Sequence, residues 1–212
     1  FLRGDTDSNI LSKKGVNIWK PNSSRKFLDS VNLFHLEEGD CGANYSFQWR
    51  HFGHKYTNKN DDYEKKGIDQ IEYIENLLKT DKTSRRIFLS AWNPCDIKNT
   101  VLPPCHVSAQ FYVNNNNELS CHLYQRSCDM FLGVPWNILS YSVLTYLLAI
   151  RNGYTPGWLY HSTGDTHIYK DHIEQIKKQL SNEVLSTSKL VINEDVKEKK
   201  WNEITIDDFD LV

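Results

Sequence analysis

The sequence predicts an α+β fold, with one mixed β-sheet, a long buried central helix and flanking helices. Two segments near the middle of the chain have the residue pattern of strands, and three others place apolar residues at helical spacing. Apolar residues make up 39% of the chain, which is enough to build a substantial core. With 212 residues, we expect a single domain over residues 1–212.

The two predicted strands are joined by a polar loop. The segment 107–113 is rich in β-branched and aromatic residues, and the segment 119–124 alternates in the same way. The asparagine run 114–117 between them is typical of a hairpin loop. Further along, residues 187–212 predict short strands separated by charged loops.

Three helices are predicted. The segment 69–78 places its isoleucines and leucines on one face, and the segment 137–151 is apolar around much of its circumference, as a buried core helix is. Gly153 stands where the second of these helices should end. Asp165 is expected to cap a third helix, which runs through Ile173 to Leu180.

Composition and charge exclude several classes of protein. A formal net charge of −2 argues against a dedicated nucleic-acid binder, and no run of eighteen apolar residues predicts a membrane span. Residues 1–9 are too polar and too few for a signal peptide. The five cysteines are odd in number and lack a C-x-x-C pair, so we expect reduced thiols in a cytoplasmic protein without a zinc site.

Cys105 is the candidate nucleophile. It follows two prolines, which fix the backbone, and it immediately precedes a predicted strand. A thiol reacts as its thiolate, which a nearby cation favours. Adjacent residues of a strand point to opposite faces, so His106 need not touch the sulfur. On local sequence alone, a structural cysteine is the favoured alternative.

Two segments are candidates for binding an anion. Arg126 and Ser127, at the end of a predicted strand, offer a planar fork of donors and a hydroxyl to a phosphate. Arg85 and Arg86 form the second candidate. For both segments the alternative is an ordinary solvated or salt-bridged arginine.

Asn137 and the pair His167 and Tyr169 are candidates for reading the rest of a nucleotide. The Asn137 amide can accept from uracil N3–H and donate to O4, or it can simply cap the apolar helix that follows. His167 and Tyr169 can hydrogen-bond a sugar hydroxyl, and the alternative is polar residues around a helix start.

These segments occur in an order that is itself informative. The run from Gly39 to Gly53 is similar to the signature Gly-Asp-x-Gly-x-x-Tyr-x-x-Gln-Trp-Arg. It is followed, at matching spacings, by Ser84-Arg-Arg-Ile87, Ala91-Trp-Asn-Pro94, Leu102-Pro-Pro-Cys-His106, Tyr124-Gln-Arg-Ser-Cys-Asp129, Leu132-Gly-Val-Pro135 with Asn137, and Gly164-Asp-Thr-His-Ile-Tyr169. Over nearly its whole length the chain resembles the folate-dependent thymidylate synthases.

The resemblance implies an activity and a set of site residues. The activity is the reductive methylation of dUMP to dTMP with 5,10-methylenetetrahydrofolate, through a covalent bond between Cys105 and C6 of the base, and it requires no metal. Catalytic roles are also implied for Tyr45 and Asp129. The implied dUMP ligands are Arg85, Arg86, Gln125, Arg126, Ser127, Asn137, His167 and Tyr169, and the implied folate contacts are Trp19, Asp129 and Gly133.

The resemblance also implies partners and leaves alternatives. It implies a sheet-to-sheet homodimer in which Arg85 and Arg86 reach the partner's phosphate site, and it allows a fusion to dihydrofolate reductase. We expect the 212 residues to lack the family's N-terminal phosphate loop and C-terminal closing segment. The alternatives are a hydroxymethylase-like relative acting on dCMP or dUMP, and a non-catalytic relative that serves as a dimerisation or binding protein.

Overall fold

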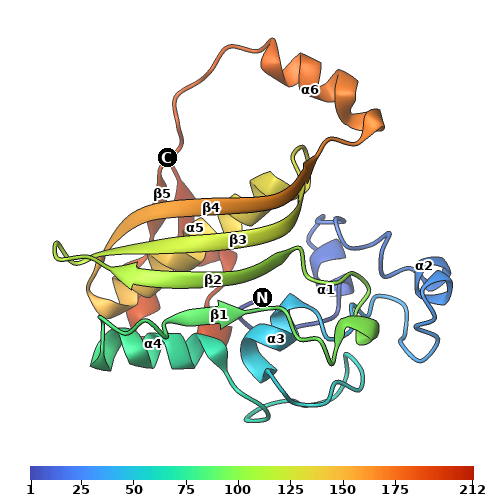
Figure 1. Ribbon diagram of the computed structural model, residues 1–212, viewed down its shortest axis with the longest axis horizontal. Coiled ribbons are helices and arrows are strands. Elements are labelled where there is room, and N and C mark those ends of the chain that lie inside the picture. The colour runs from blue at the N-terminus through green and yellow to red at the C-terminus, as the bar shows by residue number, and fades with distance from the viewer. The chain divides into compact units, whose positions relative to one another are not determined.

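The computed structural model describes residues 1–212, and the chain in it forms two compact units (Figure 1). The first unit consists of Phe1–Asn76 and Leu89–Pro104, and the second of Leu77–Phe88 and Cys105–Val212. The mixed α and β content confirms the predicted fold class. The expectation of a single domain stays a prediction.

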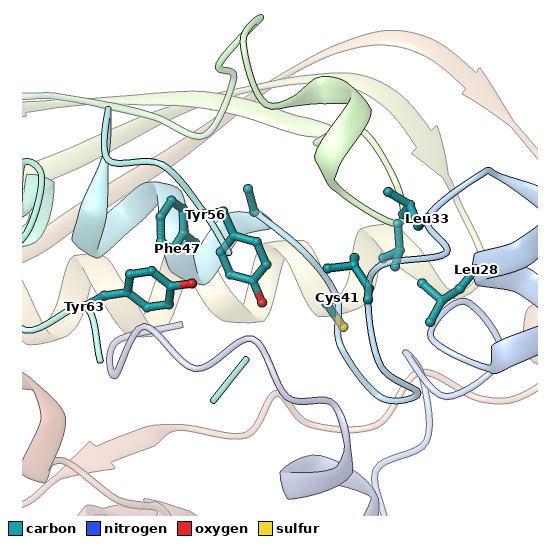
Figure 2. Close-up of a cluster of buried hydrophobic side chains, with 9 residues drawn as sticks. Leu28, Leu33, Cys41, Phe47, Tyr56 and Tyr63 are labelled. Carbon is teal, nitrogen blue, oxygen red and sulfur yellow. The ribbon is translucent and has the colours of Figure 1, made fainter. Parts of the chain in front are cut away.

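The regular elements of the first unit are mostly short helices joined by turns and loops. Its elements are α1 (Asn9–Ser12), α2 (Arg25–Ser30), α3 (Tyr45–His51), the first part of α4 (Gln70–Thr80) and the short helix η1 (Ile97–Asn99). Its core is a cluster of buried side chains (Figure 2). Within it, the ring of Phe47 meets those of Tyr56 and Tyr63 edge-on, at centroid distances of 5.0 and 4.9 Å. Such contacts fix ring orientations as well as burying area.

A buried carboxylate organises the signature segment of the first unit. Asp40 accepts hydrogen bonds from the Tyr56 hydroxyl at 2.6 Å, from the Gly42 amide at 2.8 Å and from the Lys59 amide at 3.0 Å. Burial raises the pKa of Asp40 above its ordinary value, while these donors act in the opposite direction. The carboxylate therefore holds together two loops that are far apart in sequence.

The second unit is built around three strands of a mixed sheet. They are β2 (His106–Val113), β3 (Glu118–Asp129) and β4 (Thr155–His167), which are neighbours in that order. The strand next to β2 is β1 (Phe88–Ser90), of which only Phe88 belongs to this unit. β2 pairs with β3 in antiparallel register, and β3 pairs with β4 in parallel register. The asparagine run forms the predicted hairpin loop, in which Asn117 has a φ of 59° and the Asn114 side chain accepts from the Glu118 amide at 3.0 Å.

β4 is the element that the sequence did not predict. Its residues include Pro156, Gly157 and Gly164, which usually indicate loops. Both glycines lie where β3 comes close: an added Cβ would be 2.6 Å from the Ser120 Oγ and 2.7 Å from the Arg126 carbonyl oxygen, respectively. Asp165 is a residue of β4, so its expected role as a helix cap is wrong.

α5 (Gly133–Asn152) is the buried helix of the second unit and packs against β3 and β4 (Figure 1). It begins four residues before the predicted start, with Pro135 in a first turn that tolerates proline. Gly153 ends it with a φ of 72°, as predicted. By length and composition alone α5 could cross a membrane, but residues such as Tyr141, Leu144 and Leu148 are buried in the protein.

The remaining elements follow the prediction more closely. The first predicted helix is α4, and the third is α6 (Ile173–Leu180), preceded by η2 (Lys170–His172). The tail contains two paired strands, β5 (Leu190–Ile192) and β6 (Phe209–Leu211), and the short helices η3 (Glu194–Lys197), η4 (Trp201–Glu203) and η5 (Ile206–Asp208). Arg151 of α5 holds the tail by donating to the Lys199 carbonyl at 2.6 Å and by stacking over Trp201, 4.5 Å from its ring centroid.

One face of the sheet carries exposed aromatic side chains. Along β2 and β3, residues that face α5 are buried and those between them are exposed, as the alternation of a strand requires. Tyr112 of β2 is 63% exposed, and on the neighbouring strand β4 the side chains of Trp158 and Tyr160 are 70% and 56% exposed. An apolar surface of this kind is typical of a surface that binds another protein.

Candidate active site

The pairing of β2 with β3 brings Cys105 next to Arg126. His106 is opposite Gln125 in the register, so Cys105 is opposite Arg126, and the Arg126 amide donates to the Cys105 carbonyl at 2.8 Å. The register shifts between His106 and Ser108, which is the irregularity of a β-bulge. Bulges re-aim neighbouring side chains, and this one lies directly after the candidate nucleophile. Cys105 itself is half-buried.

His106 faces the core instead of the solvent. It is 3% exposed, and its Nδ1 lies 2.9 Å from the Tyr141 hydroxyl of α5, with the two rings edge-on. Burial lowers the pKa of His106 to about 3, so the ring is neutral at ordinary pH. This placement agrees with the expectation that His106 need not act on the sulfur of Cys105.

The carboxyl ends of β3 and β4 meet at one edge of the sheet. In the parallel register, Ser127 is opposite Asp165 and Asp129 is opposite His167. The Nδ1 of His167 lies 2.8 Å from an Asp165 carboxylate oxygen, and since a carboxylate only accepts, Nδ1 carries the proton. In the neutral ring, Nε2 is then an acceptor. The Tyr169 ring stands edge-on to the His167 ring, with 5.1 Å between the ring centroids.

The start of α5 contributes Asp129, Gly133 and Asn137. Asp129 accepts from the amides of Phe131 and Leu132 at 3.2 and 3.3 Å, which orients the chain as it enters the helix. A Cβ at Gly133 would lie 3.4 Å from the Asp129 Cβ and 3.7 Å from the Asn137 Oδ1. Asn137 lies inside the helix, so its alternative interpretation as a helix cap is wrong.

A buried amide connects these elements. Gln125 is 1% exposed, and its Nε2 donates to the Ser127 carbonyl at 3.0 Å and to the Asn137 Oδ1 at 2.9 Å. Its Oε1 lies 3.0 Å from the Nε2 of His161 on β4. No sequence pattern pointed to His161, because its position beside Gln125 follows only from the register of β4, in which Gln125 is opposite Thr163.

The other predicted site residues do not belong to this cluster. Arg85 and Arg86 are exposed on the segment before β1, where the Arg85 carbonyl accepts from Gln110 at 3.2 Å. Tyr45 and Trp19 belong to the first unit, where their ring centroids are 6.0 Å apart and Tyr45 is buried. The second unit brings together Cys105, Gln125, Arg126, Ser127, Asp129, Gly133, Asn137, His167 and Tyr169. No three His, Cys, Asp or Glu side chains are placed to hold a metal ion.

Comparisons with known proteins agree with one another. A family model described as thymidylate synthase matches residues 1–212. The thymidylate synthase of Saccharomyces cerevisiae is 48% identical over the whole chain, which spans 70% of that protein. The thymidylate synthase of human herpesvirus 8 is 51% identical, with 62% of its length spanned, and the bifunctional dihydrofolate reductase-thymidylate synthase of Paramecium tetraurelia is 49% identical, with 45% spanned.

The burial of His106 predicts a loss of stability in acid. The folded-state pKa of about 3 lies below the ordinary value near 6.5, so as pH falls the unfolded state takes up the proton first. Between pH 7 and pH 5 this should remove about 2 kcal/mol from the free energy of unfolding. Denaturant titrations at both pH values should show a smaller loss, by that amount, in His106→Asn, whose amide can still bond Tyr141. Equal losses in the two proteins would contradict the prediction.

Proposed function

Because the chain belongs to the thymidylate synthase family, we propose that it converts dUMP to dTMP with 5,10-methylenetetrahydrofolate as co-substrate, releasing dihydrofolate. The observation that carries this proposal is the hydrogen bond from the Arg126 amide to the Cys105 carbonyl. It joins the candidate nucleophile to the candidate phosphate ligand at the edge of the sheet where β3 and β4 end.

The proposed reaction uses Cys105 as a covalent catalyst. Its thiolate adds to C6 of the uracil ring, and the displaced electron pair forms an enolate that makes C5 a nucleophile. C5 then bonds to the one-carbon unit, whose bond to one folate nitrogen has broken. C5 loses its proton, and the bond from the one-carbon unit to the second folate nitrogen breaks. Methylenetetrahydrofolate supplies both that carbon and the hydride that reduces it to a methyl group, and the bond between Cys105 and C6 breaks to release dTMP.

The nucleotide is proposed to lie along the edge formed by β3, β4 and the start of α5. Arg126 and Ser127 bind the phosphate, where a guanidinium fork and a hydroxyl suit its oxygens. His167, through its Nε2 acceptor, and Tyr169 bind the deoxyribose 3′-hydroxyl.

The base and the folate are proposed to meet at the start of α5. Asn137 reads the uracil ring, and its Oδ1 is held by Gln125. Gly133 keeps the space between Asp129 and Asn137 clear of a side chain, which suits the close approach of a flat ring. The roles of Trp19 as a folate contact and of Tyr45 as a residue that orders water stay predictions.

We also propose that the protein acts as a homodimer. The support is the exposed aromatic face of the sheet, which carries Tyr112, Trp158 and Tyr160. A sheet-to-sheet dimer would cover this face. Arg85 and Arg86, which are exposed in one chain, would then bind the phosphate in the partner's site.

A fusion to dihydrofolate reductase is a separate hypothesis. Its support is that the relative in Paramecium tetraurelia is named as a bifunctional enzyme of that kind. The intact mass of the natural protein distinguishes a fused from an unfused chain.

Covalent trapping tests the role of Cys105. In 5-fluoro-dUMP the fluorine at C5 cannot leave as a proton does, so the adduct should persist once the folate has reacted. Mass spectrometry of the full-length protein should show one adduct on Cys105 in the wild type and in Cys95→Ser, which alters an exposed thiol of the first unit. Cys105→Ser should show none. Absence of an adduct in the wild type would favour the non-catalytic alternative.

The substitution Asn137→Asp tests the reading of the base and the hydroxymethylase alternative. A protonated aspartate can donate to cytosine N3 and accept from its amino group, and it can still accept from Gln125. The ratio of kcat/KM for dUMP to that for dCMP should fall by at least about tenfold. An unchanged ratio would show that Asn137 does not read the ring.

Mixed dimers test whether Arg85 and Arg86 act across an interface. Full-length Cys105→Ser and the double variant Arg85→Ala, Arg86→Ala should each have little activity. In a heterodimer, the site with an intact Cys105 receives intact arginines from its partner, so dissociating and reassociating a one-to-one mixture should restore about a quarter of the wild-type activity. A mixture as inactive as its components would place the arginines in their own subunit's site.

A further inference from the structure

Three hydrogen-bonded side chains form a chain of contacts from β4 through β3 to α5. The Nε2 of His161 lies 3.0 Å from the Gln125 Oε1, and the Gln125 Nε2 lies 2.9 Å from the Asn137 Oδ1. The same Nε2 lies 3.0 Å from the Ser127 carbonyl oxygen. All of these contacts are within the second unit. Gln125 thus uses both of its amide protons and its carbonyl oxygen inside the protein.

The donor and the acceptor of each hydrogen bond among these three side chains can be assigned. A backbone carbonyl can only accept, so the Ser127 carbonyl requires the Gln125 NH₂ group on its own side. The Gln125 Oε1 then faces His161 and needs a donor there. Burial lowers the pKa of His161, so the ring is neutral and its single N–H must be on Nε2. With both Gln125 protons directed, Asn137 must present Oδ1 and not its NH₂ group.

The orientation of the Asn137 amide matters because an amide can be turned over. In one orientation it accepts from N3–H and donates to O4 of uracil. In the other it donates to N3 and accepts from the amino group of cytosine. An asparagine alone therefore does not choose between the two bases. The choice depends on what holds the amide, and a reversed Asn137 would place its NH₂ group against that of Gln125.

The remaining alternative is that the side-chain amides of Gln125 and Asn137 reverse together. It would direct the Gln125 Oε1 at the Ser127 carbonyl and the Gln125 NH₂ group at the N–H of His161. The first contact pairs two acceptors, and the second pairs two donors while the His161 proton stays on Nε2. In the 1% exposed environment of Gln125, water cannot relieve either of them. His161 thus opposes the one concerted movement that would adapt the site to cytosine.

We propose that His161 is a positioning residue that determines base specificity: by donating from Nε2 to Gln125, it locks Asn137 in the orientation that accepts dUMP and rejects dCMP. The inference rests on the proposed function, since it concerns the pyrimidine that Asn137 reads. It adds a residue of β4, with no direct contact to the base assigned to it, to those that select the substrate. Replacing such a residue should change the ratio of kcat/KM for dUMP to that for dCMP, because a general structural defect would lower both values together.

Two substitutions of matched shape test the role of the donor. In His161→Gln, the side-chain NH₂ group reaches the position of the histidine Nε2 and can donate to Gln125. In His161→Glu, the same position holds an acceptor only. Full-length enzyme of each variant is titrated with dUMP and with dCMP by calorimetry, and kcat/KM is measured for both nucleotides. Both carry the same phosphate, so the added charge of the glutamate cancels in the ratio.

The expected outcome is a split between the two variants. His161→Gln should keep the dUMP-to-dCMP ratio within about twofold of wild type, and His161→Glu should lower it by about tenfold, the effect of one buried hydrogen bond lost or reversed. If His161→Glu does not fold, His161→Leu removes the donor without adding charge and should lower the ratio several-fold. Wild-type ratios in the donor-free variants, or equal losses in the glutamine and glutamate variants, would overturn the inference. A wild-type enzyme that neither binds nor converts dUMP would instead overturn the proposed function.

Discussion

The structure depends on the position of β3 between two partners of opposite direction. Its antiparallel pairing with β2 sets Cys105 opposite Arg126, and its parallel pairing with β4 sets Asp129 opposite His167. Side chains alternate along a strand, so a slip of one residue in either pairing would turn its residues to the other face. The Cys105 thiol and the residues proposed to bind phosphate and sugar therefore stay together only because both registers are fixed. The hairpin loop after β2 and the two glycines of β4 help to fix them.

Features with a local cause could be predicted from the sequence. The hairpin, α4, α5 and the end of α5 at Gly153 all depend on residue pattern or on a backbone conformation that one residue type favours. The proposed site residues came from ordered motifs that resemble a family, since none of them was convincing singly. Cys105 precedes β2, Arg126 lies on β3 and Asn137 lies on α5, all within the second unit, and their shared role stays a prediction.

Features with a non-local cause could not be predicted. β4 contains glycines because β3 lies too close for a Cβ, and a sequence shows the glycines but not the neighbouring strand. His161 could not be predicted for the same reason: its contact with Gln125 exists only when β3 and β4 are paired, and the sequence does not show that pairing. Asp165 and Asn137 were both interpretable as helix caps because small polar residues serve equally well at helix starts, in strands and in binding sites.

The apolar character of α5 has a consequence for how the protein folds while it is being synthesised. Ribosomes synthesise the chain from its N-terminus, so α5 is complete before β4, which follows it and forms part of the surface on which it packs. During that interval a helix apolar enough to pass for a membrane span lacks part of its cover. Chaperones that bind nascent chains, and the machinery that sorts hydrophobic segments to membranes, meet this helix at its most exposed. The pairing of residues 155–167 with β3 is therefore the step that completes this part of the surface against which α5 packs.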